Sequence, residues 1–321
     1  MIKVEGLVKH YGDKYAVNNI SFTVGDREIV GFLGPNGAGK STTMNILTGY
    51  LSATDGKVEI DGHDILEDTM AAKKSIGYLP EIPPLYPDMT VKEYLNFVYD
   101  LKECKLNRKK HLEEITNVTK IADVYNRVIK NLSRGYKQRV GIAQALVGNP
   151  KVIILDEPTI GLDPKQIVEV RNLIRTLGRD HTVILSTHIL SEVQAVCDRL
   201  VIINKGKIVA DKPTEEISQA VVTKCRLEAK ICGPEKDVLY GIRSINGVTR
   251  CETVGSELDS VTYVIESEAG LDVRKPLFNL LAGKNWPLMG LTTMGMNLED
   301  IFITLTIDPT KEKNNRRRIT K

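Results

Sequence analysis

The sequence predicts two domains, an α/β domain with a parallel sheet over residues 1–220 and a smaller α+β domain over residues 221–308. The length supports two domains, because 321 residues exceed the roughly 100–200 residues of an ordinary domain. Three short apolar runs support the parallel sheet, since each resembles a strand buried on both faces and each is followed by polar or glycine-bearing residues. These runs are IVGFL (29–33), VIIL (152–155) and VILST (183–187).

The rest of the first domain follows two other patterns. Apolar and polar residues alternate in IKVEGLVK, NNISFTV and GKVEIDG, which predicts an antiparallel β subdomain against one side of the parallel sheet. Further along, the strand patterns stop, and a capping box at Thr90 and Glu93 opens a helical pattern. We therefore expect a helical insertion at about residues 82–149.

The second domain has a different order of elements. Strands are predicted in TKCRLEAKI, VTRCETV, VTYVIES and PLMGLTTM, and helices in EKDVLYGIRSI and RKPLFNLLAG. This βαββαβ order is that of a ferredoxin-like domain, and a short helix in NLEDIFITL is expected to follow it. Trp286 is expected to pack inside the domain, and residues 309–321 to form a disordered basic tail, with a contact to anionic lipid as the alternative. No catalytic pattern falls here, which favours an accessory role in regulation or dimer formation.

Composition and charge exclude several classes of protein. The chain is 42% hydrophobic and 26% charged, and it lacks an apolar run of the roughly 18 residues that a membrane-spanning helix needs. Because the N-terminus carries no apolar signal segment, we expect a cytoplasmic protein. The five cysteines show no CxxC spacing, which predicts reduced thiols and no zinc site. The net charge of +3 arises in the basic tail, so no nucleic-acid partner is expected.

The segment GPNGAGKSTT directly follows the first buried strand and opens a helix. Its two glycines, lysine and hydroxyl have the spacing of a phosphate-binding loop, whose backbone N–H groups and helix N-terminus attract a phosphate. Lys40 is expected to reach the β- and γ-phosphates, and Ser41 to bind Mg²⁺. A purely structural glycine turn is the alternative. The predicted nucleotide-binding residues of this loop are Gly34, Asn36, Gly37, Gly39, Lys40, Ser41 and Thr42.

Two adjacent carboxylates, Asp156 and Glu157, end the second buried strand. The carboxyl ends of parallel strands meet at one edge of a sheet, which places this pair beside the phosphate loop. Asp156 is the expected partner of Mg²⁺, directly or through water. Glu157 is the expected catalytic base or water-positioning group, because hydrolysis of a phosphoanhydride needs an oriented water. The alternative is an ordinary solvated start of a loop.

Several motifs occur in a fixed order along the first domain. They are Tyr11, GPNGAGKS (34–41), LSRGYKQR (132–139), VIILDEP (152–158), GLD (161–163) and His188. In this order and spacing, the sequence resembles the ATPases of ABC transporters. It looks like the subunits of drug, sodium or polysaccharide exporters, in which the membrane-spanning subunit is a separate polypeptide. The resemblance implies the P-loop NTPase fold of an ABC ATPase, with ATP and Mg²⁺ as ligands.

The resemblance also implies roles for single residues. Tyr11 would stack on the adenine, with a merely structural edge-strand aromatic as the alternative. His188 would sense the γ-phosphate and act with Glu157 in catalysis, unless it is a structural histidine. Ser133 and Gly135 would contact the γ-phosphate of ATP bound by a second subunit, so that a homodimer holds two ATP molecules between its subunits.

Three residues depart from the family pattern. Arg134 stands where the family commonly has glycine, and Tyr136 where it has glutamine. Glu81, in GYLPE (77–81), also replaces a glutamine. A carboxylate at position 81 can still approach Mg²⁺, so Glu81 joins Ser41 and Asp156 as a predicted metal ligand.

The loop IPPLYPDM (82–89) follows Glu81, and its three prolines prevent it from joining a helix or a central strand. Leu85 and Tyr86 are predicted to fill a groove around a short cytoplasmic helix of the membrane subunit. The alternative is that these side chains pack on the helical insertion.

The leading prediction is the ATP-hydrolysing, energy-coupling subunit of an ABC exporter, a dimer that is peripheral on the inner face of the cell membrane. Two alternatives remain open, an ABC-type ATPase without a transport partner and a regulatory ATP-binding module with low turnover. The transported molecule is not predicted, because that specificity would lie in the membrane subunit.

Overall fold

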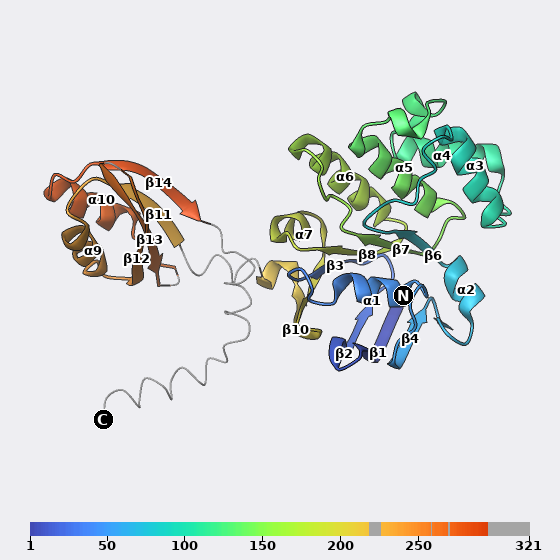
Figure 1. Cartoon of the computed structure of the whole chain (residues 1–321), viewed down its shortest axis with the longest axis horizontal. Coiled ribbons are helices and arrows are strands. Elements are labelled where there is room, and N and C mark those ends of the chain that lie inside the picture. Colours follow the sequence, from blue (N-terminus) through green and yellow to red (C-terminus); the bar gives the residue numbers. More distant parts are fainter. Residues whose placement is uncertain (218–225, 258, 269, 295–321) are drawn as a thin grey trace. The chain divides into compact units, whose positions relative to one another are not determined.

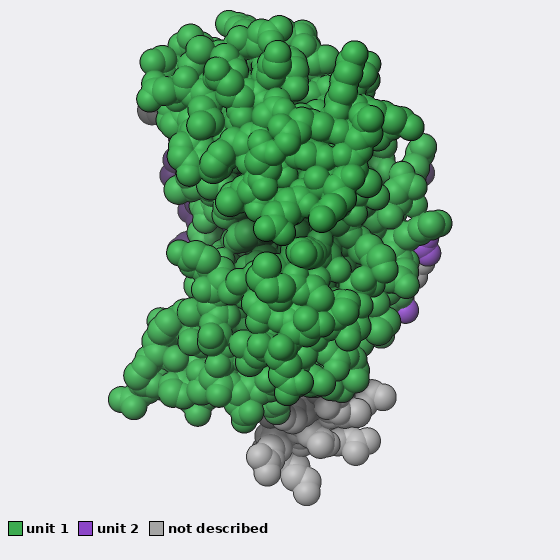
Figure 2. All heavy atoms as spheres, turned by 90° about the vertical axis from the view of Figure 1, so that its right-hand side faces the viewer, with its two compact units in different colours: residues 1–214 green, residues 215–321 purple. Residues whose placement is uncertain are grey.

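The structure, a computed structural model, describes residues 1–217, 226–257, 259–268 and 270–294. The chain divides into two compact units, Met1–Thr214 and Glu215–Lys321 (Figure 1). Figure 2 shows one face of the first unit with its side chains. Each unit is described by itself.

The first unit is built around a six-stranded sheet with the order β10-β9-β3-β8-β7-β6. Five of these strands run parallel, and only β10 pairs antiparallel, with β9. The three apolar runs form β3 and the greater parts of β7 and β8, and every residue of these strands is buried, which confirms the parallel α/β prediction. The strands are β3 (Ile29–Leu33), β6 (Ile76–Leu79), β7 (Val152–Asp156), β8 (Thr182–Thr187), β9 (Arg199–Asn204) and β10 (Lys207–Pro213).

A second, antiparallel sheet has the order β2-β1-β4-β5. Its alternating side chains share one apolar core with the central sheet and the helix after the glycine loop, and Phe22 lies 5.5 Å from Phe32 between ring centroids. This sheet therefore supports the phosphate loop from one side. The elements are β1 (Ile2–Tyr11), β2 (Lys14–Val24), α1 (Lys40–Leu47), β4 (Asp55–Ile60), β5 (His63–Asp64) and α2 (Thr69–Lys74).

Helices occupy most of the chain between β6 and β7. The capping box at Thr90 is present in both halves, since the Thr90 side chain accepts from the N–H of Glu93 and the Glu93 side chain accepts from the N–H of Thr90. Val91, Tyr94 and Leu95 are buried on the inner face of this helix, as its periodicity predicts. The helices are α3 (Val91–Leu101), α4 (Arg108–Val118), η1 (Ala122–Val124), η2 (Ile129–Asn131) and α5 (Arg134–Leu146), followed after β7 by α6 (Pro164–Leu177) and after β8 by α7 (Leu190–Val196).

The second unit contains one sheet with the order β12-β13-β11-β14, in which every pair of neighbours is antiparallel. Two helices cover one face of it, and Trp286 packs against the shared core as expected. The helix predicted in NLEDIFITL and the basic tail lie outside the described residues. The elements are β11 (Arg226–Ile231), α9 (Glu235–Arg243), β12 (Val248–Glu257), β13 (Ser260–Ser267), α10 (Arg274–Gly283) and β14 (Leu288–Met294).

Within the described ranges, every helix is too short or too polar to span a lipid bilayer.

Candidate functional site

The phosphate loop lies between β3 and α1, and it passes very close to two other strands. A Cβ atom at Gly34 would lie 2.4 Å from the carbonyl oxygen of Ile203, and one at Gly39 would lie 2.4 Å from that of Ala16. Gly37 and Gly39 also have positive φ angles of 77° and 111°, which residues with a side chain rarely adopt. The backbone can therefore take this path only with glycine at these positions.

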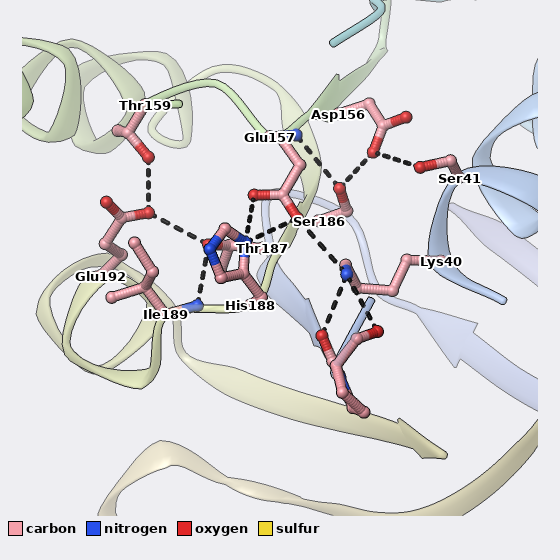
Figure 3. A network of polar contacts seen from close by, with 12 residues as sticks. Lys40, Ser41, Asp156, Glu157, Thr159, Ser186, Thr187, His188, Ile189 and Glu192 are labelled. Carbon is pink, nitrogen blue, oxygen red and sulfur yellow. Dashed lines mark hydrogen bonds and ion pairs between the residues drawn. The ribbon is translucent and has the colours of Figure 1, made fainter. Parts of the chain in front are cut away.

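Lys40 begins helix α1 and is buried, with 6% of its surface exposed. Its ammonium donates to the carbonyl oxygens of Gly34 at 2.9 Å and Pro35 at 3.4 Å, and it lies 3.3 Å from Oε1 of Glu157 (Figure 3). A buried ammonium needs such partners because removing its charge from water is costly. Lys40 therefore ties the loop after β3 to the carboxylate after β7.

Asp156 ends strand β7 beside the start of α1. The Ser41 hydroxyl donates to Oδ1 of Asp156 at 3.4 Å, and the Ser186 hydroxyl, from β8, donates to the same oxygen (Figure 3). Burial raises the pKa of the Asp156 carboxyl above its usual value, whereas these hydrogen bonds lower the pKa and oppose that shift. Ser186 was not predicted from the sequence, because its contact joins two strands that are far apart in the chain.

Glu157 has a left-handed backbone, with φ of 48°. This conformation is uncommon for a residue with a side chain and costs about 1–3 kcal/mol. The N–H of Glu157 donates to the backbone oxygen of Ser186 at 3.2 Å and to its hydroxyl at 3.1 Å, which holds the turn. The carboxylate accepts from Nδ1 of His188 at 3.0 Å and faces Lys40 (Figure 3). The turn therefore presents the carboxylate to the phosphate loop.

A buried carboxylate behind His188 fixes the loops on which His188 and Glu157 lie. Glu192, on α7, is 4% exposed and accepts from the hydroxyls of Thr159 and, at 3.1 Å, Thr187 (Figure 3). Thr159 lies in the loop after β7 and Thr187 ends β8, so one side chain connects these two segments. Glu192 is a positioning residue that sequence reasoning missed, since nothing in its local pattern separates it from a solvated helix residue.

A pocket of about 520 Å³ brings most of the predicted residues together. Four residues that sequence reasoning missed also line it, namely Lys14, Tyr15, Ala16 and Ile160. The hairpin register was an available signal for Tyr15, because it pairs with His10 beside Tyr11. The predicted residues that line the pocket are Tyr11, Asn36, Gly37, Gly39, Lys40, Ser41, Thr42, Glu81, Glu157 and His188.

Ser133 and Gly135 are not among the residues that line this pocket. Ser133 is the N-cap of α5, where its hydroxyl accepts from the N–H of Tyr136 at 3.4 Å. Gly135 faces α6, and a Cβ there would lie 2.6 Å from Cδ of Gln166. A contact of these two residues with ATP therefore requires the ATP of another subunit, as the resemblance implies.

Tyr136, one of the three departures, is engaged within its own chain. Its hydroxyl donates to the carboxylate of Asp123 at 2.5 Å, and the guanidinium of Arg139 lies 4.8 Å from its ring centroid. The hydrogen bond to Asp123 is the main reason that the pKa of Tyr136 is raised. Tyr136 therefore connects α5 to η1.

The loop after Glu81 differs in part from its predicted role. The ring of Tyr86 lies 5.4 Å from that of Phe97 and 6.1 Å from that of Tyr94, both on α3. Tyr86 therefore packs on the helical insertion, as the alternative interpretation has it, although it is 51% exposed. Ile82 is 83% exposed and is the most exposed apolar side chain of this loop.

Comparisons with known proteins agree with this geometry. A family model described as ABC transporter matches residues 17–160. The bacitracin transport ATP-binding protein BcrA of Bacillus licheniformis is 35% identical over 221 residues, 68% of this chain and 72% of the relative. The linearmycin resistance ATP-binding protein LnrL of Bacillus subtilis is 31% identical over 318 residues, 95% of this chain and 98% of the relative.

Among solved structures, the dimeric ATP-binding cassette MJ0796 in a post-hydrolysis state with ADP and Pi is 27% identical, with a TM-score of 0.61 over 67% of this chain and 99% of that one. Together with the phosphate loop and the paired carboxylates, these matches establish the family. The chain belongs to the ATP-binding proteins of ABC transporters, and it is an ATP-hydrolysing subunit that couples ATP to transport.

Proposed function

We propose that this chain drives an exporter as a homodimer, with two Mg²⁺-bound ATP molecules held between the subunits and a separate membrane-spanning subunit as partner. Each ATP would lie on the phosphate loop of one subunit and against Ser133 and Gly135 of the other. The observation that carries the proposal is the cluster in which Lys40 and His188 both contact the Glu157 carboxylate beside the phosphate loop.

This cluster supports a specific order of events. The γ-phosphate of bound ATP offers Lys40 a stronger partner than Glu157, because it carries more negative charge than a single carboxylate. Glu157 is then available to orient the attacking water and accept its proton, while His188 holds the carboxylate through Nδ1–H. The strained turn at Glu157 keeps the carboxylate in this place, since relaxation of the backbone would move it away from the loop.

The residues around Ser41 fit Mg²⁺. This cation prefers oxygen ligands and usually combines one or two protein groups with substrate phosphates and water. The Ser41 hydroxyl and the Asp156 carboxylate are 3.4 Å apart and supply such oxygens, and Glu81 lines the same pocket. In the described ranges no group of three or more histidine, cysteine or carboxylate side chains could hold a metal ion. Bound Mg²⁺ would neutralise charge on the phosphates during transfer.

We place the ATP-binding domain at residues 1–220 and an accessory domain at 221–308. The sheet order β12-β13-β11-β14 with two helices on one face supports a ferredoxin-like fold for the second domain. The match to LnrL extends over 95% of this chain, whereas that to BcrA extends over 68%. A resistance ATPase thus shares the two-domain length, which supports export rather than import.

A groove in the first unit supports the proposal that a membrane subunit binds this chain at the inner face of the membrane. The groove has a volume of about 710 Å³ and lies where α1, β6, α3 and α5 meet. Tyr50, Tyr78 and Pro84 give it apolar walls, and Tyr50 is 84% exposed. Aromatic residues such as Tyr50 are enriched at protein interfaces. We propose that a short cytoplasmic helix of the membrane subunit binds here, so that Tyr50→Asp abolishes co-purification with that subunit.

Two variants test the nucleotide site. Lys40→Ala should remove most ATP affinity in calorimetry, whereas Lys105→Ala, at an exposed lysine outside the pocket, should change it little. Glu157→Gln should retain ATP binding, lower turnover by about 10²–10⁴-fold and trap an ATP-bound dimer in sizing experiments. Hydrolysis by Glu157→Gln at the wild-type rate would refute the assignment. A wild-type protein that binds ATP but barely turns over with its membrane fraction would favour the regulatory module instead.

A further inference from the structure

Arg134 is an exposed cation at a position where a cation is unfavourable. It is the first residue of α5 after the N-cap Ser133. The helix dipole places partial positive charge at this end, and a cationic side chain here is destabilising unless an anion lies nearby. In the portion of the chain that the structure describes, Arg134 makes no hydrogen bond or ion pair. By contrast, Arg139 on the same helix pairs with Glu169.

The guanidinium of Arg134 nevertheless has a defined place. It lies against the backbone of Gly161, where a Cβ atom would approach its Cζ to 2.3 Å. Gly161 has φ of 66° and stands in the loop that leads from Glu157 to Asp163, the N-cap of α6. Any side chain at 161 would displace the guanidinium, so glycine at this position is what allows Arg134 to lie flat on the loop.

The acidic side chains around α5 are already engaged. Asp123 accepts from Tyr136, Glu169 pairs with Arg139, and the Asp163 side chain accepts from the N–H of Gln166. The start of α5 therefore presents an uncompensated positive charge next to Ser133. Within the described residues no carboxylate pairs with this guanidinium, whose five fixed N–H donors match a phosphate in shape and charge.

We propose that Arg134 donates to the γ-phosphate of ATP bound by the other subunit of the dimer, beside Ser133. This inference rests on the proposed ATP-sandwich dimer and adds a residue to it. No bond of Arg134 forms or breaks in the reaction. It neutralises the charge on the equatorial oxygens of the transferred phosphoryl group, as cations supplied across an interface do in other phosphoryl-transfer sites. The departure from glycine at this position would then strengthen the interaction between subunits.

The first experiment uses full-length Glu157→Gln, in which ATP should trap the dimer. Adding Arg134→Gln should raise the ATP concentration that is needed for half-maximal dimer formation by about 10-fold to 100-fold, the usual range for a charge-assisted bond. Arg134→Lys should recover part of this loss, because it keeps the charge but not the planar donor pair. Thermal unfolding and far-ultraviolet circular dichroism of each variant would exclude a fold defect.

The second experiment assigns the contact to the partner. Differently tagged subunits are co-purified so that one carries Lys40→Ala and only the other binds ATP, and ATP turnover is measured. Arg134→Gln should reduce turnover at least 10-fold when it lies on the Lys40→Ala subunit, and change it little when it lies on the ATP-binding subunit. Two outcomes would overturn this inference and leave the proposed dimer intact. One is an equal effect of Arg134→Gln on both subunits. The other is dimer formation by Glu157→Gln at the same ATP concentration with and without the added Arg134→Gln. Failure of Glu157→Gln itself to dimerise with ATP would overturn the proposed dimer and this contact with it.

Discussion

Lys102 is a half-buried lysine whose ammonium contacts only backbone oxygens in the described structure. It follows the last residue of α3, and its Nζ donates to the carbonyl oxygens of Val147 at 2.8 Å, Ala145 at 3.3 Å and Gln144 at 3.4 Å. These carbonyls end α5, where four backbone oxygens of any helix lack a partner within the helix. The lysine satisfies several of them and places its charge at the negative end of the helix dipole.

Burial lowers the pKa of Lys102 from 10.5 to about 8. Between pH 8 and 10.5 the unfolded chain therefore binds more protons at this side chain than the folded chain does, and the free energy of unfolding rises with pH. Below pH 8 both states carry the charge, and the cost of burying it is present in full. Above pH 10.5 both states are neutral and the cost is absent. At about 1.4 kcal/mol for each pKa unit, the whole change amounts to about 3 kcal/mol.

Lys102→Met isolates this contribution, because methionine keeps the aliphatic stem and removes the ammonium. Urea unfolding of the wild type and the variant at pH 7.5 and pH 10 gives the difference between their unfolding free energies at each pH. We expect the wild type to gain about 2–3 kcal/mol relative to the variant over this range, since other groups titrate equally in both proteins. The exposed Lys105→Met should show no such gain. A difference for Lys102→Met that is independent of pH would refute the lowered pKa of this ammonium.

Three further predictions concern the site. Gly39→Ala should remove ATP binding, because the new Cβ would meet the Ala16 carbonyl oxygen and φ at this position is 111°. It should also lower the free energy of unfolding by at least about 1–3 kcal/mol in urea titrations. A variant with wild-type stability contradicts this. Ser186→Ala removes a hydrogen bond that lowers the pKa of Asp156, so the acid limb of the ATPase pH profile should move to higher pH. An acid limb that does not move would show that ionisation of Asp156 does not determine it. Tyr136→Phe should retain ATP turnover while lowering the free energy of unfolding by about 1 kcal/mol or less, through loss of the bond to η1; a large loss of turnover would show a role at the nucleotide.

The parts of the site that the sequence predicts are those encoded within one short segment. The phosphate loop joins a buried strand to a helix within residues 29–47, so this one segment indicates both the residue types of the loop and its position in the fold. Asp156 likewise ends a buried strand, and Glu157 follows it directly. Because the carboxyl ends of parallel strands meet at one edge, proximity between the two segments follows from the fold class alone.

The residues that sequence reasoning missed act across segments. Glu192 joins the ends of two strands, and Lys102 joins α3 to the end of α5. Neither side chain differs in its local pattern from a solvated residue on a helix. Their roles depend on which carbonyl or hydroxyl group another segment brings within reach, and residue periodicity carries no such information.

Side-chain direction in loops is equally hidden. The prolines of residues 82–89 predict a stiff loop, but not which way Tyr86 turns, and its ring lies on Phe97 of α3. Tyr136 departs from the family pattern beside the predicted nucleotide contact, yet its hydroxyl donates to Asp123. In both cases the side chain contacts a nearby group of the same chain, and the sequence alone does not determine this direction.

Helix α5 connects the two surfaces that the proposed transporter needs. Its first turn carries Ser133 and Arg134, which we assign to the ATP of the other subunit, and its last turn is capped by Lys102 in the groove assigned to the membrane subunit. At about 1.5 Å per residue, its 13 residues span about 20 Å. A continuous helix moves as a rigid element, so a partner that shifts the capped end also shifts the phosphate contact at the other. Coupling between transport and ATP hydrolysis therefore needs no change within the phosphate loop itself. It needs only a displacement of α5 that the membrane subunit and the ATP of the other subunit favour in the same direction.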